Sequence, residues 1–220
     1  MRGPERQAQA RSIATRERLI ETTLETIHQL GLKRASTPEF ARRAGVSRGA
    51  LLHHFPTRDD IIVAAMETLL EQATDEIRRV AAEVARDDLG MAELLDFLWE
   101  MFSGRFFYLS VEFINEARTD PALRAKMQPL VRHFHEALDD IWAENCGTGQ
   151  VDRAGARVLL NLTLCLFRGM GVQTVLRDDP EYFRTLLETW KTLLPTLAGA
   201  LGDAAEKPAG QQRRAARAKP

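Results

Sequence analysis

Two short segments on either side of Gly45 constrain the fold of this chain more than any other feature. In the first, Thr37 is placed to cap a helix, and Pro38 follows at the first helical position, where its missing N–H costs nothing. Gly45 stands where a helix ends in the left-handed conformation, and Ser47 is placed to cap the next helix. Residues 37–55 therefore predict two helices joined by a tight turn, the layout of a helix-turn-helix unit that binds duplex DNA.

The second of these helices has one apolar and one exposed face. Leu51 and Phe55 are four residues apart and are predicted to face inward. In this geometry the first residues of the second helix enter the major groove, so Arg48 is the best candidate for a base-edge contact and His53 the second. The whole set of candidate DNA-contacting residues is Thr37, Arg43, Ser47, Arg48, Gly49, Ala50, Leu52, His53 and Arg58, of which Thr37, Arg43, Ser47 and Arg58 are expected to hold phosphates.

This stretch resembles the helix-turn-helix of the tetracycline-repressor (TetR) family of bacterial transcription regulators. The matching residues are Thr37, Ala44, Gly45, Val46, Ser47, Gly49, Leu51, His54 and Phe55. Leu52 departs from the pattern, because the family usually has a tyrosine there, and Arg58 stands where lysine is usual. The resemblance implies an all-α fold, with an N-terminal three-helix helix-turn-helix DNA-binding domain and a C-terminal six-helix ligand-binding and dimerisation domain.

The rest of the sequence is also patterned for helices, because no stretch alternates for long with a period of two. Besides the helix-turn-helix, we expect helices at 12–31, 58–86, 91–103, 105–118, 121–145, 152–177 and 180–200. We also expect four regions: a flexible basic leader at 1–11, the DNA-binding domain at 12–57, the ligand-binding and dimerisation domain at 58–202, and a disordered basic tail at 203–220.

Charge is distributed unevenly along the chain. Residues 1–58 hold eleven basic and five acidic side chains, whereas residues 59–202 hold fourteen basic and twenty-four acidic ones. Residues 203–220 are basic again, with five basic and two acidic side chains. A basic end on an acidic chain is typical of a protein that binds DNA through that end.

Large apolar side chains are concentrated between residues 94 and 142, and a few polar groups lie among or beyond them. Aromatic residues at helical spacing are often plain core, but in a ligand-responsive family such a zone lines a cavity. Arg105 could pair with an acidic ligand, extend its charged end to solvent while its stem stays in contact with apolar groups, or pair with an acid at a helix end. The candidate ligand-binding residues are Trp99, Phe102, Arg105, Phe106, Phe113, Phe134, Trp142 and Arg168.

The last two expected helices are apolar on more than one face. One face can serve the core of the protomer, and the other can form a symmetric four-helix dimer interface, unless the core is entirely intramolecular. The candidate interface residues are Leu162, Leu166, Gly169, Leu176, Phe183, Leu187, Trp190 and Leu194.

Other classes of protein find little support in the sequence. The histidines make no pair at i, i+4, and there is no nucleophile elbow, Walker loop or Cys-x-x-Cys, so we expect no catalytic residues, no metal and no cofactor. Cys146 and Cys165 suit a reducing cytoplasm as unpaired thiols. No apolar run reaches about 18 residues, so we expect no membrane partner.

Together these features predict a cytoplasmic, homodimeric transcription regulator. The main expectation is a repressor that binds a palindromic DNA operator and is released by a small, largely apolar effector molecule. Two alternatives of the same fold stay open at this point: a transcriptional activator, and a DNA-binding protein that responds to no ligand.

Overall fold

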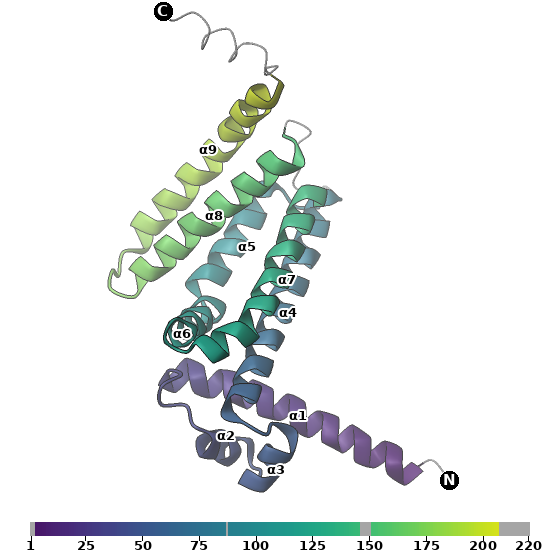
Figure 1. The fold of residues 1–220 in the computed structure, drawn as a ribbon. Helices are drawn as coiled ribbons and strands as arrows, with labels where there is room; N and C mark the ends of the chain where they lie inside the picture. Colours follow the sequence, from purple (N-terminus) through teal and green to yellow (C-terminus); the bar gives the residue numbers. More distant parts are fainter. Residues whose placement is uncertain (1–2, 87, 146–150, 207–220) are drawn as a thin grey trace, which may run out of the picture. The chain divides into compact units, whose positions relative to one another are not determined.

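The computed structural model describes residues 3–86, 88–145 and 151–206, and in these residues the chain is entirely helical (Figure 1). This confirms the predicted all-α class. The helices of the described residues are α1 (Gly3–Leu30), α2 (Thr37–Ala44), α3 (Arg48–His54), α4 (Arg58–Ala85), α5 (Met91–Ser103), α6 (Arg105–Thr119), α7 (Pro121–Asn145), α8 (Arg153–Thr174) and α9 (Pro180–Glu206).

The chain forms two compact units. Unit 1 comprises residues 1–76 and 103–135, and unit 2 comprises residues 77–102 and 136–220. The helix-turn-helix thus shares unit 1 with α6 and with the first parts of α4 and α7. The expected domains met between residues 57 and 58, whereas the first compact unit includes α4 up to residue 76. The helices α4 and α7 each contribute residues to both units.

The core of unit 1 is built around α1, which packs on α2 and α6. Leu24 and Ile27 of α1 are fully buried, as is Phe40 of α2. Leu51 of α3 and Ile61 of α4 are also fully buried, so the short helices are held by apolar contacts rather than by their own length. The burial of Phe40 and Leu51 confirms the predicted inward faces of the helix-turn-helix.

The first helix begins earlier than predicted. Residues 3–11, expected to be a flexible leader, are helical and continue without a break into residues 12–30. Residues 6–11 are alanine, glutamine and arginine, which are strong helix formers, and a helix that has nucleated extends readily through such residues. At the other end Gly31 has a φ of 74°, which confirms the predicted helix stop.

The core of unit 2 is formed by α5, α8 and α9 together with the adjoining parts of α4 and α7. Leu94 and Leu98 of α5 are buried, as are Leu159 and Phe167 of α8. The helices α8 and α9 pack side by side (Figure 1). The expected tail at 203–220 begins inside α9, which runs to Glu206, and residues 207–220 lie outside the described residues.

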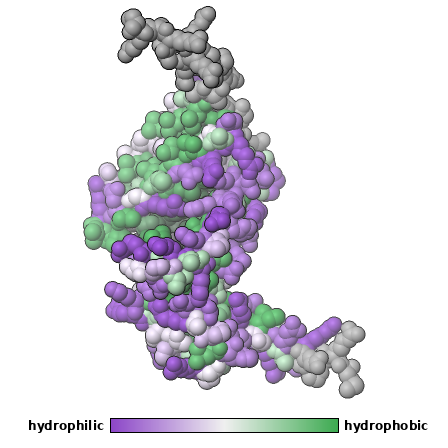
Figure 2. All heavy atoms as spheres, in the orientation of Figure 1, coloured by the Kyte–Doolittle hydropathy of each residue, from purple (hydrophilic) through white to green (hydrophobic). Residues whose placement is uncertain are grey.

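An apolar face of α8 and α9 is left uncovered in the single chain, and Figure 2 shows hydrophobic side chains gathered over these helices. Leu162 and Leu176 are exposed, as predicted for interface residues. Three other predicted interface residues are not on this face, because Phe183, Leu187 and Leu194 are buried in unit 2. The other exposed apolar residues of this region are Val158, Val172, Val175, Leu193 and Leu197.

The correction concerns which face of α9 points inward. Residues 183, 187, 194 and 198 recur at helical spacing and form the buried face, so Leu193 and Leu197 fall to one side of it and stay exposed. Both faces of α9 are apolar, and the sequence pattern alone does not distinguish them. By length and composition α8 is also apolar enough to cross a membrane, but 44% of its apolar window is buried, and core helices have the same composition.

Candidate nucleic-acid interface

The exposed face of α3 is the centre of the candidate DNA interface. The Ser47 side chain caps this helix by accepting a hydrogen bond from the Ala50 N–H at 3.1 Å, as predicted. Leu51 and Phe55 are buried and fix the inward face. The residues left outside are Arg48, Gly49, Leu52 and His53, all exposed, with Ala50 half-buried.

The turn between α2 and α3 depends on Gly45. This residue has a φ of 66°, in the left-handed region, and its N–H donates to the carbonyls of Ala41 and Arg42. The Val46 N–H also donates to the Ala41 carbonyl, at 3.0 Å. These bonds end α2 and set the direction in which α3 leaves it. No atom lies within 4 Å of the place where a Cβ would stand, so backbone conformation alone makes glycine necessary here.

The start of α2 differs from the expectation. Thr37 is the first residue of the helix, and the cap position belongs to Ser36, whose side chain makes no capping hydrogen bond. Pro38 occupies the first turn, as predicted. Because proline has no N–H to donate, fewer donors at this end require a side-chain cap.

Two arginines of α2 are held by a carboxylate of the same helix. Arg42 and Arg43 pair with Glu39 at 2.7 and 2.6 Å, and Arg43 also donates to the Gln29 side chain at 2.7 Å. Hydrogen bonds from Arg42 and Arg43 lower the pKa of Glu39 to about 2. Arg43, predicted to hold a phosphate, is therefore already paired with a carboxylate of its own helix.

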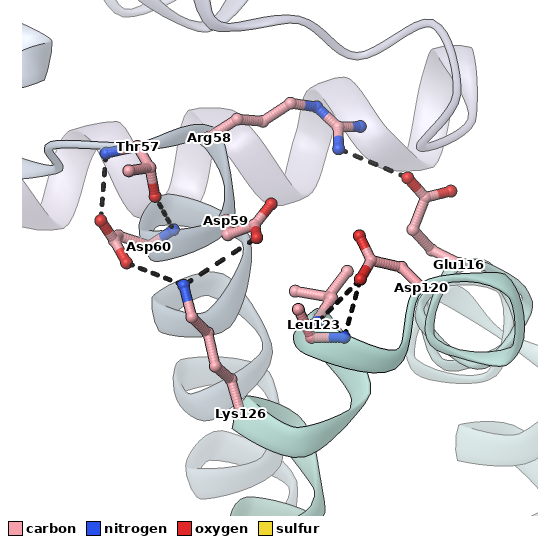
Figure 3. A network of polar contacts seen from close by, with 9 residues as sticks. Thr57, Arg58, Asp59, Asp60, Glu116, Asp120, Leu123 and Lys126 are labelled. Atoms are coloured by element: carbon pink, nitrogen blue, oxygen red, sulfur yellow. Dashed lines mark hydrogen bonds and ion pairs between the residues drawn. The ribbon is translucent and has the colours of Figure 1, made fainter.

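Arg58 has a different environment from the predicted phosphate contact. Its guanidinium donates to the Leu32 carbonyl at 2.7 Å and to the Ala35 carbonyl at 3.3 Å, both in the loop between α1 and α2. It also pairs with Glu116 of α6 at 3.4 Å (Figure 3). Sequence reasoning missed this role because these partners lie 23 to 58 residues away along the chain.

Glu112 of α6 makes a second contact with the same loop. Its Oε2 accepts a hydrogen bond from the Leu32 N–H at 2.7 Å, directly after the left-handed Gly31. Glu112 and Glu116 are four residues apart and so share one face of α6. That spacing was the available signal in the sequence. We call the contacts of Glu112 and Arg58 with residues 31–35, together with the Arg58–Glu116 ion pair, the loop clasp.

A network of polar contacts surrounds the loop clasp at the start of α4 (Figure 3). Thr57 and Asp60 form a capping box, since the Thr57 N–H donates to Asp60 and the Asp60 N–H donates to the Thr57 hydroxyl. Hydrogen bonds from Thr57 lower the pKa of Asp60. Lys126 of α7 reaches Asp60 at 3.4 Å and Asp59 at 3.9 Å. Within unit 1, α4 is thus joined to both α6 and α7.

Comparison with known proteins decides the family. A model of bacterial regulatory proteins of the tetR family matches residues 19–65, which include α2, α3 and the start of α4. The HTH-type transcriptional regulator CymR of Pseudomonas putida is 32% identical over 181 residues, covering 82% of this chain and 89% of that protein. The chain belongs to the tetR family. The resemblance predicted from residues 37–55 is confirmed.

Solved structures of tetR-type regulators have the same fold. The multidrug binding protein EbrR complexed with proflavin is 28% identical with a TM-score of 0.56, covering 83% of this chain and 99% of that one. A TetR-family member from Streptomyces coelicolor A3 is 28% identical with a TM-score of 0.55, covering 80% and 97%. The relatives in this tetR family are transcription regulators, not enzymes.

The residues predicted to bind the effector of this tetR-family protein fall into separate groups. In unit 1, Phe106 lies 6.1 Å from Phe134, Phe113 is buried, and Arg105 pairs with Glu21 of α1 at 2.6 Å. The partner of Arg105 is thus an acid in the middle of α1, not one at a helix end. Unit 2 holds the remaining four residues, which are Trp99, Phe102, Trp142 and Arg168.

Unit 2 contains one small apolar cavity near these residues. Its volume is about 10 Å³, which is about the space of a single water molecule. Of the predicted ligand residues, Trp142 lines it; the other lining residues are Ile77, Ala81, Leu94, Leu98, Leu138, Ile141, Leu160 and Leu164. An effector larger than a water molecule could enter this cavity only by displacing its lining side chains. Trp99 instead packs on Phe167 and Phe183, with ring centroids 6.0 Å apart in each case.

Proposed function

We propose that this tetR-family protein is a cytoplasmic repressor that binds a palindromic DNA operator as a homodimer and is released by a small, largely apolar molecule. The observation that carries the proposal is the outward face of α3, where Arg48 and His53 are exposed on a helix capped by Ser47. A bidentate arginine contact to guanine contributes about 1–3 kcal/mol of discrimination. We assign base contacts to Arg48 and His53, and phosphate contacts to Ser47 and the start of α2.

Dimerisation is supported by the uncovered face of α8. Val158, Leu162, Gly169 and Val172 of α8 are exposed, as is Leu176 in the turn after it, and they recur at alternating intervals consistent with a heptad seam, with exposed Cys165 filling the remaining position. Such a seam requires a partner helix, and a second copy of the chain supplies one by symmetry. Two recognition helices about 34–36 Å apart would then enter successive major grooves.

Ligand response is supported by the loop clasp and by the relatives. EbrR, a solved neighbour, is a multidrug binding protein that has been seen with proflavin. In this chain the loop clasp ties α6 to the loop that precedes α2, and α4 and α7 each pass from one unit into the other. An effector that shifts these helices has to change free energy by only about 1–3 kcal/mol to vacate the operator.

The first experiment is selection of DNA from a random pool, followed by a mobility-shift assay. We expect a palindromic sequence, and we expect Arg48→Ala to relax preference at one base of each half-site. Unchanged affinity and selectivity in Arg48→Ala would contradict the assignment of base contacts. Sedimentation at micromolar concentration should give a dimer, and a screen of small apolar molecules should find one that releases the selected DNA.

A further inference from the structure

Arg168 of α8 differs from the other arginines of its region. Arg153, Arg157, Arg177 and Arg184 are exposed, and each lies beside an aspartate or glutamate within 3.0 Å. Arg168 is half-buried, and no carboxylate in residues 3–86, 88–145 or 151–206 lies within 4 Å of its guanidinium. Burial lowers the pKa of this guanidinium. A cation withdrawn from water normally has an anionic partner. None of the described residues supplies an anionic partner to Arg168.

The surroundings of Arg168 are aromatic. The Cζ atom of Arg168 lies 5.5 Å from the centroid of the Phe102 ring, within the range of a cation–π contact. Trp99, three residues before Phe102 on α5, is stacked on Phe183 and edge-on to Phe167. The guanidinium of Arg168 thus packs on an aromatic ring, and its N–H groups donate to no carboxylate of the described residues.

The small cavity of unit 2 approaches this group along two helices. Leu98 and Leu164 line the cavity, and each is followed four residues later on the same helix face by Phe102 and Arg168 respectively. One helical turn beyond the apolar cavity lining there are therefore an aromatic ring and, 5.5 Å from its centre, a cation. A ligand that matched this order would have an apolar body and one anionic end.

We propose that Arg168 is the charge-recognition residue of the effector site and that the effector is an organic monoanion with an apolar body and a carboxylate. The planar guanidinium donates two parallel hydrogen bonds to a carboxylate, a geometry that lysine does not provide. This proposal rests on the proposed ligand response. It adds the chemical class of the ligand and the residue that selects it.

The test compares two probes with the same body, 2-naphthoate and 2-naphthalenemethanol, by fluorescence titration of the full-length dimer. Wild type should bind the carboxylate at least about tenfold more tightly than the alcohol, because hydrogen bonds to charged groups are stronger than those between neutral groups. Arg168→Met should abolish this preference and leave alcohol binding unchanged. The matched control is Arg184→Met, which removes an exposed, paired arginine of the same unit and should keep the preference.

Arg168→Lys keeps the charge without the planar guanidinium, so we expect its preference for the carboxylate to be intermediate. If Arg168→Met does not fold, Arg168→Lys still tests the proposal. Equal binding of the two probes by wild type, absence of binding by either probe, or a preference that survives in both variants would overturn the proposal. Binding of the selected operator is measured separately. A wild type that prefers naphthoate but binds no DNA would reject the proposed function and leave the assignment of Arg168 standing.

Discussion

Arg58 satisfies three acceptors at once, two loop carbonyls and the Glu116 carboxylate. Its side chain is 32% exposed, so solvent replaces these bonds only in part when the side chain is removed. The residue at this position therefore acts on the position of the α1–α2 loop more than on DNA directly. Its effect should be found first in the free energy of unfolding.

We predict that Arg58→Met destabilises the protein by about 1–3 kcal/mol, the range for hydrogen bonds to charged groups. Urea unfolding measures this change. Arg48→Met, an exposed substitution on α3, should change stability by less than about 0.5 kcal/mol and is the control. Unaltered stability in Arg58→Met, together with weaker binding to all DNA sequences, would restore the phosphate contact expected from the sequence.

Two glycines of the helix-turn-helix should respond oppositely to alanine. Gly45→Ala places a Cβ on a residue with a φ of 66° and should cost about 1–2 kcal/mol. Gly49 lies inside α3, and the nearest atom to an added Cβ is the Ser47 hydroxyl at 3.9 Å, so Gly49→Ala should stabilise by up to about 1 kcal/mol. Thermal unfolding measures both, and a loss of stability in Gly49→Ala would contradict the explanation.

Residues whose role is local could be predicted from the sequence, and those whose role is long-range could not. Gly45, Ser47 and the pair of Thr57 and Asp60 interact within about four positions, so their spacing carries the information. Glu112 meets Leu32 across 80 positions. The spacing of Glu112 and Glu116 places both on one face of α6, but it does not say which residues that face meets, because this depends on how α1 and α6 pack.

At the scale of the helices, α2 and α3 begin differently. Ser47 caps α3 with its side chain, whereas Ser36 at the start of α2 makes no such bond. We predict that Ser47→Ala costs about 1 kcal/mol and that Ser36→Ala costs little. Chemical denaturation of the two variants gives the comparison, and equal losses would show that the cap of α3 is not special.

The ion pairs of α2 predict a dependence on pH. The pKa of Glu39 is lowered from 4.5 to about 2 in the folded protein, so its contribution to stability is present above pH 4.5 and is lost as the pH falls to about 2. The melting temperature of wild type should exceed that of Glu39→Gln at pH 7, by a small amount for an exposed group, and the difference should vanish near pH 2. A constant difference would contradict this.

At the scale of the whole molecule, the main feature is the apolar face of α8 and α9 that the single chain leaves exposed to solvent. We predict that Leu162→Glu makes the protein monomeric in sedimentation, because it places a charge in the proposed seam. Ile114→Glu is the control, since Ile114 is 62% exposed on α6 of unit 1 and is not a residue of the seam. The monomer should lose most of its affinity for a palindromic operator, and a dimeric Leu162→Glu would place the interface elsewhere.

The packing of unit 2 also explains why the interface could be predicted only in part. Both faces of α9 are apolar, and the choice between them is made by contact with α8, where the Trp190 indole donates to the Thr163 hydroxyl at 3.1 Å. That bond and the burial of Leu187 fix the rotation of α9. The pattern of residues alone is compatible with either face.

The loop clasp has two halves of unequal strength. The Glu112 side chain extends from α6 to the C-terminal end of α1, where its carboxylate accepts the Leu32 N–H. The helix dipole is negative at this end and therefore opposes the carboxylate. Arg58 is the first residue of α4, where the helix dipole is positive, but its guanidinium makes two bonds to carbonyls and one to an acid, against the single bond of Glu112. When α6 moves, the Glu112 bond should open first while Arg58 still holds the loop. The release of DNA would then proceed in two steps, with a half-open intermediate.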